Sequence, residues 1–186
     1  MTAALVPFAP GFEEMEGVIV VDIARRAGWR VDSVGLTDGP VEASRGVRIL
    51  PDKAWADISP ETYDLLVLPG GAGGVKALCA DPRLLEAIRV FDRTGKWIGA
   101  ICAAPLALQA AGILTPGRKV TCHPAVARQL PAGVRSDART VVDGRLITSQ
   151  GPGTAIDFAL ALIRQIDGEA AAARVAEGLV LSCRGG

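Results

Sequence analysis

Aromatic residues, histidine and paired cysteines are scarce in this chain. Phe, Trp and Tyr together account for 4% of its 186 residues, and His123 is the only histidine. The four cysteines show no C-x-x-C spacing, and one histidine without clustered cysteines does not make a structural zinc site. These absences argue against a metal centre and a dithiol framework, and they favour reduced thiols in the cytosol.

An excess of charge of one sign and long apolar runs are missing as well. Lys plus Arg number 20 and Asp plus Glu number 20, so the formal net charge of +0 indicates neither a nucleic-acid surface nor a membrane surface. No apolar stretch approaches the ~18 residues needed to span a bilayer. No basic residue precedes the first apolar segment, so we expect no secretory signal and a cytoplasmic location.

The chain does contain enough apolar material for a substantial core. Hydrophobic residues make up 49% of the sequence, and the mean hydropathy is +0.32. A chain of this length fits one domain that buries roughly 70% of its unfolded surface. We find no repeat, linker or low-complexity segment, and therefore predict a single domain over residues 1–186.

Short apolar runs alternate with longer helical patterns along the chain. This alternation favours an α/β fold with a mostly parallel sheet that is covered on both faces. The Asp-Gly turn within residues 141–147 predicts a hairpin that adds an antiparallel piece to the sheet edge. The predicted strands are residues 3–8, 30–35, 65–68, 97–101 and 120–122, and the predicted helices are residues 15–27, 82–94, 105–111 and 154–166.

The first predicted helix, residues 15–27, is apolar around nearly its whole circumference. Asp22 and Arg26 stand four residues apart and can pair along one side. A helix of this composition must be covered on two sides, one of them by the sheet. A second copy of the chain would cover the other side in a homodimer, and another helix of the same chain is the alternative.

Cys102 lies between the apolar run 97–101 and the helical pattern that follows it. Backbone N–H groups at the start of a helix favour an anion, by at most ~2 kcal/mol in partly buried geometry. At ~1.36 kcal/mol per pKa unit, this placement lowers a thiol pKa from ~8.5 to roughly 7. The alternative is a buried, inert thiol, which is our expectation for Cys79 and Cys183.

Three segments are expected to meet beyond the carboxyl ends of the strands, where open parallel sheets form their sites. They are residues 8–16, the glycine-rich turn 69–74 and Cys102. Glu13 and Glu14 fit the ordinary role of carboxylates near a helix N-terminus. Glu16 sits inside the helix, where a buried carboxyl would have a raised pKa and could donate a hydrogen bond to sulfur or carry a proton.

The turn 69–74 has two interpretations. It is either plain turn chemistry, or it brings backbone N–H groups close to a ligand. In the second case the N–H of Gly71, with that of Ala103, could stabilise an oxyanion. A nucleotide-phosphate loop is not indicated, since neither G-x-x-x-x-G-K-[ST] nor G-x-G-x-x-G occurs in the turn. The sequence leaves two roles open for His123: it is either a base for Cys102 or a solvated loop residue.

Five segments together make the chain resemble the Parkinsonism-associated deglycase family, the DJ-one branch of the ThiJ/PfpI superfamily. The resemblance runs in order over nearly the whole chain. It implies a flavodoxin-like three-layer α/β sandwich, a homodimer through the first helix and a reactive cysteine at a nucleophile elbow. The matching segments are residues 11–16, 43–47, 68–71, 100–105 and 148–154.

The resemblance also implies roles for individual residues. Cys102 matches the nucleophile and oxidation-sensitive residue of the family, and Glu16 matches its protonated carboxylic partner. His123 falls at the histidine of the animal members, which bacterial relatives can lack. Arg45 lies where the family places an arginine near the site and the dimer contact. The oxyanion- and substrate-binding residues implied are Gly70, Gly71, Ala103 and Arg45.

The chemistry implied is a cofactor-free conversion of methylglyoxal or glyoxal to a hydroxy acid, together with reversal of early glycation adducts on protein or nucleotide. The alternative is a non-enzymatic sensor of oxidative stress, or a redox-regulated chaperone, in which Cys102 is oxidised to sulfinate. Peptidase relatives place histidine directly after the nucleophile, where this chain has Ala103. Amidotransferase relatives use His-x-Glu, whereas Pro124 and Ala125 follow the histidine here.

Overall fold

A seven-stranded sheet in the order β5-β2-β1-β6-β7-β9-β8 forms the centre of the computed structural model, which describes residues 1–181. All neighbouring strands are parallel except β8 and β9. A separate antiparallel pair is formed by β3 and β4. The strands are β1 (Ala3–Phe8), β2 (Arg30–Gly35), β3 (Val41–Glu42), β4 (Arg48–Ile49), β5 (Lys53–Ala54), β6 (Leu65–Leu68), β7 (Trp97–Ile101), β8 (Thr140–Asp143) and β9 (Leu146–Ser149).

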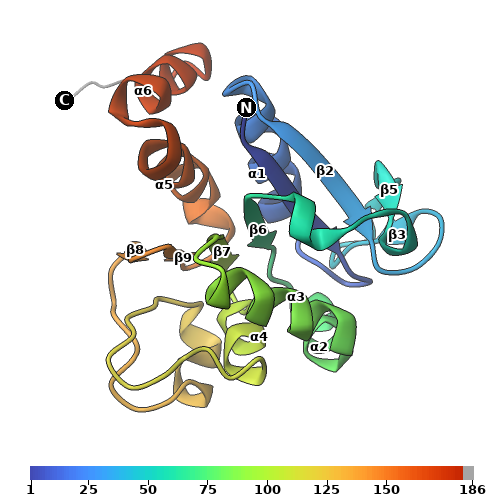
Figure 1. Ribbon diagram of the computed structural model, residues 1–186, viewed down its shortest axis with the longest axis vertical. Helices are drawn as coiled ribbons and strands as arrows, with labels where there is room; N and C mark the ends of the chain where they lie inside the picture. Colours follow the sequence, from blue (N-terminus) through green and yellow to red (C-terminus); the bar gives the residue numbers. More distant parts are fainter. Residues whose placement is uncertain (182–186) are drawn as a thin grey trace.

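Helices cover both faces of this sheet (Figure 1), so the fold has three layers. One face carries α1 (Glu14–Arg26), α5 (Ala155–Asp167) and α6 (Glu169–Gly178), and the other carries α2 (Ala72–Ala80), α3 (Pro82–Arg93) and α4 (Pro105–Ala110). Short 3₁₀ helices complete the structure: η1 (Trp55–Asp57), η2 (Pro60–Thr62), η3 (Pro124–Gln129) and η4 (Pro152–Thr154).

The first strand explains why two separate cores form. All six residues of β1 are buried, and successive side chains of a strand point to opposite faces of the sheet. Leu5 therefore packs in the cluster beneath α2, α3 and α4, whereas Val6 packs in the cluster beneath α1, α5 and α6. A strand that is buried on both faces has to be apolar throughout, as the sequence of β1 is.

The predicted α/β fold with a mostly parallel sheet is confirmed. Taking β1, β2, β6, β7 and β9 as five consecutive strands gives the order 2-1-3-4-5, which is that of flavodoxin-like sheets. The first four of these strands have the predicted bounds, and β8 forms the predicted antiparallel edge. The carboxyl ends of β1, β6 and β7 lie at one edge of the sheet, so the segments after them are brought together.

Two predictions of secondary structure differ from what is observed, and several elements were not predicted. The strand at residues 120–122 is wrong, because only an isolated bridge between Val120 and Arg135 forms there. The turn 69–74 is shorter than predicted, since its last three residues belong to α2. The helices α2 and α6 and the two-residue strands β3, β4 and β5 were not predicted from the sequence.

The first helix is covered by the sheet on one side and by α5 of the same chain on another. Asp22 and Arg26 form the predicted pair, with 2.7 Å between Oδ2 and Nε. Met15 is 52% exposed and Val18 is 46% exposed, so an apolar strip of α1 stays uncovered in the monomer. A helix of the same chain, which was the alternative to a second copy, therefore covers only part of the circumference of α1.

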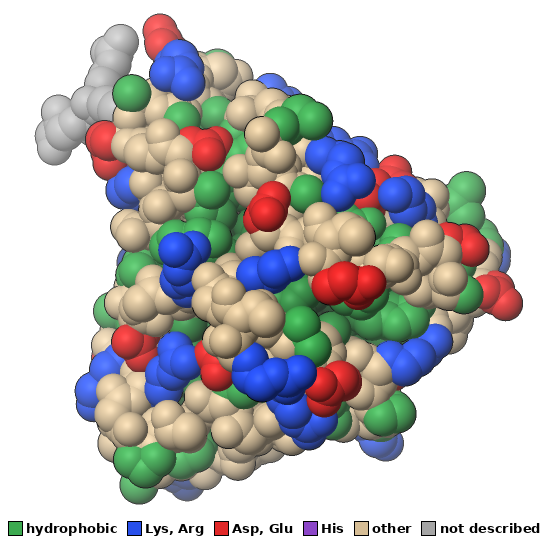
Figure 2. Space-filling view, in the orientation of Figure 1, with side chains coloured by type: hydrophobic (Ala, Val, Ile, Leu, Met, Phe, Trp, Pro, Cys, Tyr) green, Lys and Arg blue, Asp and Glu red, His purple; other side chains and the backbone are tan. Residues whose placement is uncertain are grey.

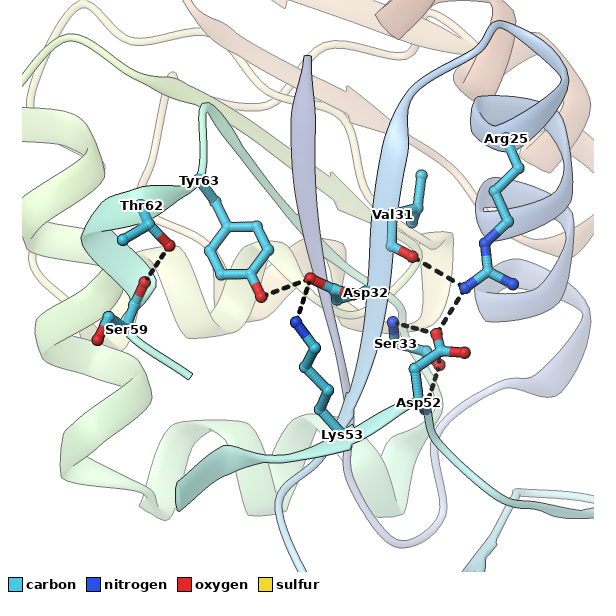
Figure 3. Close-up of polar contacts among 9 residues, drawn as sticks. All are labelled: Arg25, Val31, Asp32, Ser33, Asp52, Lys53, Ser59, Thr62 and Tyr63. Carbon is cyan, nitrogen blue, oxygen red and sulfur yellow. Dashed lines mark hydrogen bonds and ion pairs between the residues drawn. The ribbon is translucent and has the colours of Figure 1, made fainter. Parts of the chain in front are cut away.

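A network of polar side chains holds the β2–β5 edge of the sheet (Figure 3). Asp32 of β2 accepts hydrogen bonds from the hydroxyl of Tyr63 (2.7 Å) and from Nζ of Lys53 in β5 (3.0 Å). Asp52 accepts from the backbone N–H and the hydroxyl of Ser33, and it pairs with Arg25 at 2.6 Å. Asp32 and Asp52 thus each accept hydrogen bonds that stabilise the negative charge of the carboxylate.

The surface mixes charges of both signs. In the face shown in Figure 2, Lys and Arg side chains are interspersed with Asp and Glu side chains, in keeping with the formal net charge of +0. Within residues 1–181, no helix combines the length and the apolar character needed to cross a membrane.

Candidate active site

Cys102 directly follows β7 in a strained backbone conformation. Its φ is +64°, in the left-handed region that a non-glycine residue adopts only at a cost of about 1–3 kcal/mol. Two backbone hydrogen bonds hold this turn: the N–H of Cys102 donates to the carbonyl of Ser149 (2.9 Å), and the N–H of His123 donates to the carbonyl of Cys102 (2.8 Å). The chain between β7 and α4 is therefore a sharp elbow with the thiol at its tip.

Glu16 on α1 is fully buried next to this elbow. Its Oε2 accepts a hydrogen bond from the backbone N–H of Gly70 at 2.6 Å. Its Oε1 is buried without a hydrogen-bond partner among the described residues. Burial raises the pKa of Glu16 to about 7. Hydrogen bonds from the Gly70 N–H and from the Cys102 side chain oppose this rise. A raised pKa was predicted for this carboxyl, and the prediction is confirmed.

Gly70 and Gly71 allow close approaches that a side chain would block, Gly70 to the thiol and the carboxyl and Gly71 to the backbone after β1. A Cβ atom on Gly70 would lie 2.5 Å from Cβ of Cys102 and 2.7 Å from Oε2 of Glu16, so no other residue fits without a shift. Gly71 has a φ of +88°, and a Cβ there would lie 2.5 Å from the carbonyl oxygen of Gly11. The glycines of this turn thus let backbone approach side chains closely, as the second interpretation of the turn requires.

The thiol of Cys102 does not have the lowered pKa that its position in the sequence predicts. Burial and the negative charge of Glu16 raise the pKa of Cys102 to about 12, whereas hydrogen bonds from the backbone N–H groups of Gly71 and Ala103 lower it. The predicted helix contribution is weak here because α4 has only six residues and begins at Pro105, three residues after the thiol.

Glu16 and Cys102 act as one titrating pair. Burial and mutual repulsion oppose a second negative charge in the pocket, so one proton is shared between the two groups over a wide pH range. The sulfur faces two N–H donors, from Gly71 and Ala103, while the carboxyl group receives one, from Gly70. With the pKa of Cys102 at about 12 and that of Glu16 at about 7, this proton resides mainly on the sulfur near neutral pH. Its transfer to the Glu16 carboxyl would leave a thiolate that faces the two N–H donors.

His123 lines the same cavity and is half-buried. Its Nδ1 accepts a hydrogen bond from the backbone N–H of Ala125 at 3.2 Å, so Nε2 is the ring nitrogen that carries an N–H. Among the described residues, no hydrogen bond joins the imidazole to the thiol of Cys102. The structure thus makes His123 a wall of the site and gives no direct support to its role as the base of Cys102.

The expected meeting of three segments is confirmed by a cavity of about 610 Å³. Glu13 follows β1, Gly71 follows β6 and Cys102 follows β7, and all three line it. Arg45 lines the cavity from the loop between β3 and β4. The other lining residues are Ser44, Ala72, Val75, Lys76, Cys79, Ala103, Leu106, His123, Ala125, Val126, Gln129 and Pro152.

The two acidic residues before Glu16 have different roles. Glu13 caps α1 as expected, with its Oε2 accepting from the N–H of Glu16 at 2.8 Å. Glu14 is buried, and its carboxylate accepts from the hydroxyl of Ser44 (2.8 Å) and the backbone N–H of Arg45 (2.9 Å). Burial alone would raise the pKa of Glu14, but hydrogen bonds from its own N–H, Ser44 and Arg45 hold it below the ordinary value. Glu14 therefore fastens the Arg45 loop to the rim of the cavity.

The wall of the cavity formed by α2 was not predicted from the sequence. Cys79 was predicted to be buried, whereas it is half-buried and lines the cavity with Val75 and Lys76 of α2. The spacing 72, 75, 76 and 79 places these residues on one helix face, a signal hidden because the helix itself was not predicted. Cys183 lies outside the described residues. Within residues 1–181, no group of three or more His, Cys, Asp or Glu residues is placed to hold a metal ion.

Comparison with known proteins agrees with this geometry. A model of the DJ-1/PfpI family matches residues 2–165 of the chain. The chain belongs to this family. It is 42% identical to the Drosophila melanogaster protein dj-1beta, over 97% of this chain and 97% of that protein. It is 38% identical to the Caenorhabditis elegans glutathione-independent glyoxalase DJR-1.2, over 84% of this chain and 83% of that protein.

The family fold extends over the sheet and both helical layers. Oxidized DJ-1 from Toxoplasma gondii superposes with a TM-score of 0.93 and 36% identity, covering 97% of this chain and 98% of that chain. The family resemblance deduced from five short segments is thus confirmed over nearly the full length, and so is the flavodoxin-like architecture.

Proposed function

We propose that this protein is a glyoxalase-type enzyme that converts methylglyoxal or glyoxal to the hydroxy acid without a cofactor, with Cys102 as nucleophile. The observation that carries the proposal is the buried Glu16 carboxyl, which lies against Gly70 and has a pKa of about 7 beside the thiol. A C. elegans relative named a glutathione-independent glyoxalase supports the reaction class. Reversal of early glycation adducts is the same chemistry started from an adduct, and it belongs to the proposal as a secondary activity.

The first step is addition of sulfur to the aldehyde. The Cys102 thiol passes its proton to the Glu16 carboxylate, the sulfur forms a bond to the aldehyde carbon, and the electron pair of the C=O bond moves to oxygen. The N–H groups of Gly71 and Ala103, which already point at the sulfur, would stabilise that oxygen. The carboxylic acid of Glu16 gives its proton to the oxygen, which yields a neutral hemithioacetal and a Glu16 carboxylate.

The second step moves a proton between neighbouring carbons. The Glu16 carboxylate removes the proton from the former aldehyde carbon and returns it to the adjacent ketone carbon. The hydroxyl proton on the former aldehyde oxygen passes to the former ketone oxygen, which completes a thioester of the 2-hydroxy acid. The aldehyde carbon is oxidised and the ketone carbon is reduced, so no external oxidant is needed. Water then cleaves the thioester, which breaks the S–C bond and releases lactate from methylglyoxal or glycolate from glyoxal.

Other residues have supporting roles in the proposal. Gly70 holds the Glu16 carboxyl through its N–H, and Arg45 at the rim supplies positive charge for the developing carboxylate. His123 keeps its place in the catalytic set as a wall residue whose ring N–H is available to substrate oxygen. We further propose one domain over residues 1–186, a cytoplasmic location, and a homodimer in which the exposed Met15 and Val18 of α1 pack against a second copy.

The test is stereospecific measurement of lactate formed from methylglyoxal by the purified protein. Cys102→Ser should abolish turnover, and Glu16→Gln should reduce it severely, since neither variant retains the pair that shares a proton. Cys122→Ser is the matched control, because that thiol is buried away from the cavity, and it should keep the wild-type rate. Retained lactate formation by Cys102→Ser would refute the proposal.

A redox sensor or redox-regulated chaperone is the second candidate, and the geometry around the sulfur favours it specifically. The N–H groups of Gly71 and Ala103 and a protonated Glu16 could hold the oxygens of a Cys102 sulfinate. Mass spectrometry after mild peroxide treatment distinguishes the two functions. A sensor should take up two oxygens on Cys102 selectively and show no lactate formation before oxidation.

A further inference from the structure

The cavity that contains Cys102 is much larger than a three-carbon dicarbonyl requires. Its volume of about 610 Å³ falls in the range of roughly 300–1,000 Å³ that holds drug-sized ligands. Methylglyoxal bonded to the sulfur would occupy only the end formed by Gly71 and Ala103. The residues that line the remaining volume indicate which kind of ligand would fill it.

The free volume extends along α2. Gly71 caps this helix at the thiol, and Cys79 lines the cavity eight residues further on, which is roughly 12 Å along the helix axis. Ala72, Val75 and Lys76 line the stretch between them, at a spacing that keeps all these side chains on one helix face. The cavity thus reaches along this face of α2 from the sulfur to Cys79, and we call this part of it the groove.

The walls of the groove are mainly apolar. Val75 of α2, Leu106 of α4 and Val126 of η3 line the cavity, together with Ala125 of η3. Lys76 makes no ion pair within residues 1–181, and its methylene stem can cover an apolar ligand while the amino group stays in water. Gln129 is the polar residue of the η3 wall. Such a groove fits an unbranched apolar chain better than a polar one.

We propose that the preferred substrates are linear 2-oxoaldehydes whose alkyl chain lies along α2, with a chain of about six carbons. An extended six-carbon chain spans roughly 8 Å at C–C bond lengths near 1.5 Å, which fits between the sulfur and Cys79. This inference rests on the proposed glyoxalase function and adds the substrate class to it. The reaction balances as for methylglyoxal: 2-oxooctanal plus water gives 2-hydroxyoctanoate and a proton, with the aldehyde carbon oxidised and the ketone carbon reduced.

The size of the preference follows from burial of methylenes. Each fully buried methylene is worth about fourfold in binding, which is ~0.8 kcal/mol. The groove is open to solvent on one side, so we count two of the six carbons as fully buried. We therefore expect kcat/KM for 2-oxooctanal to exceed that for methylglyoxal by at least about tenfold.

The experiment compares the two substrates in wild-type protein and in two variants of α2, by measuring the 2-hydroxy acids formed. Cys79→Phe places a ring at the far end of the groove and should reduce the kcat/KM ratio of 2-oxooctanal to methylglyoxal at least about fivefold. Ala80→Phe is the matched control: it adds the same ring to the same helix at an exposed position that does not line the cavity. This control should leave the ratio unchanged.

The outcomes separate this inference from the function on which it rests. If wild-type protein converts methylglyoxal but handles 2-oxooctanal no better, the substrate class is wrong and the glyoxalase function stands. If neither substrate is converted, the glyoxalase function itself fails. Should Cys79→Phe not fold, Leu106→Ala removes an apolar wall instead and should lower the same ratio. An unchanged ratio in a folded wall variant would overturn the groove assignment.

Discussion

Glu16 and Asp32 are both buried carboxyl groups, yet their surroundings shift their pKa values in opposite directions. Glu16 is 0% exposed, has one N–H donor and leaves Oε1 without a partner among the described residues. Asp32 is 8% exposed and receives hydrogen bonds from Tyr63 and from the ammonium group of Lys53. Burial raises the pKa of Glu16 to about 7. Burial also opposes ionisation of Asp32, but the hydrogen bonds from Tyr63 and Lys53 and the charges of Lys53 and Arg30 outweigh it and hold the pKa of Asp32 below the ordinary value of 3.8.

This difference distinguishes a buried carboxyl with a structural role from one with a reactive role. A satisfied carboxylate stays ionised and ties elements together, as Asp32 joins β2 to β5 in Figure 3. An under-satisfied carboxyl is poised to hold or release a proton near neutral pH. The strained φ of Cys102 and the close approach at Gly70 also indicate a reactive site around Glu16. Backbone strain and buried polar groups without hydrogen-bond partners are concentrated at functional sites.

Exchanging each carboxyl for its amide should separate the two roles most strongly. Glu16→Gln should lower kcat/KM for methylglyoxal by roughly 10²–10⁴-fold, because an amide cannot carry the proton between carbons. Asp32→Asn is the matched change in the structural network and should leave kcat/KM within about twofold, since it lies away from the cavity. Lactate formation measures both. Equal losses in the two variants would mean that burial alone, without the thiol, explains the effect.

Adding one methyl group at Gly70 should break the site while the Asp32 network persists. The new Cβ would lie 2.5 Å from Cβ of Cys102, so the thiol or the Glu16 carboxyl must move. A misplacement of about 1 Å can cost about 100-fold in rate, which is the loss of kcat/KM that we expect from Gly70→Ala. Gly178→Ala is the control, because a Cβ there meets nothing within 4 Å. Gly70→Ala with wild-type kinetics would show that the tight packing is not needed.

The two carboxyls should also give stability the opposite dependence on pH. A raised pKa means that the folded protein holds the Glu16 proton more tightly, so this stabilisation is complete below about 4.5 and is lost as the pH rises through about 7. A lowered pKa means that the contribution of Asp32 is present above 3.8 and is lost as the pH falls through its folded value.

Urea denaturation between pH 3 and pH 8 tests this contrast. The free energy of unfolding of wild type relative to Glu16→Gln should fall by roughly 3 kcal/mol between pH 4.5 and pH 8. The free energy of unfolding of wild type relative to Asp32→Asn should instead fall as the pH is lowered below 3.8. Parallel curves for the two pairs would contradict the assignment of opposite shifts.

The smallest expected effect is at Glu14, a third buried carboxyl that is satisfied like Asp32 but lies beside the site. Its two oxygens accept from Ser44 and Arg45, and the amide of Glu14→Gln offers only one acceptor oxygen. Loosening the Arg45 loop should raise KM for methylglyoxal about fivefold with little change in kcat. Glu42→Gln is the control, since Glu42 is exposed in the neighbouring strand. A change in kcat alone would assign Glu14 to the chemistry and not to positioning.

Much of the fold could be predicted from the sequence because its signals are local. The apolar runs of β1, β2, β6 and β7 are bounded by turn residues, and their predicted ends agree with the structure. The helix α6 also carried a local signal in its run of alanines, which favour helix. The helix α2 did not, because Gly73 and Gly74 disfavour helix. A Cβ on Gly74 would lie 2.6 Å from Cα of Phe12, so packing against a distant segment selects glycine there.

The candidate site was predictable in its residues and not in its electrostatics. The order of strands and loops indicated that Glu16, Gly71 and Cys102 would meet. The direction of the thiol pKa was wrong, since a helix of six residues contributes little and burial with Glu16 contributes much. The strand predicted at residues 120–122 was wrong for a related reason. Its backbone is satisfied by loop 134–136 and by the hydroxyl of Thr148, which no local pattern reveals.

The sequence by itself determined the strand–helix alternation, the elbow cysteine and the carboxyl in the first turn of α1, because each depends on neighbours within a few residues. The tertiary structure alone decided which N–H groups reach the thiol, that Glu16 keeps an oxygen without a partner, and that a long apolar groove continues from Cys102 along α2. These properties depend on desolvation and on distances between segments far apart in the chain, and both quantities exist only once the layers have packed.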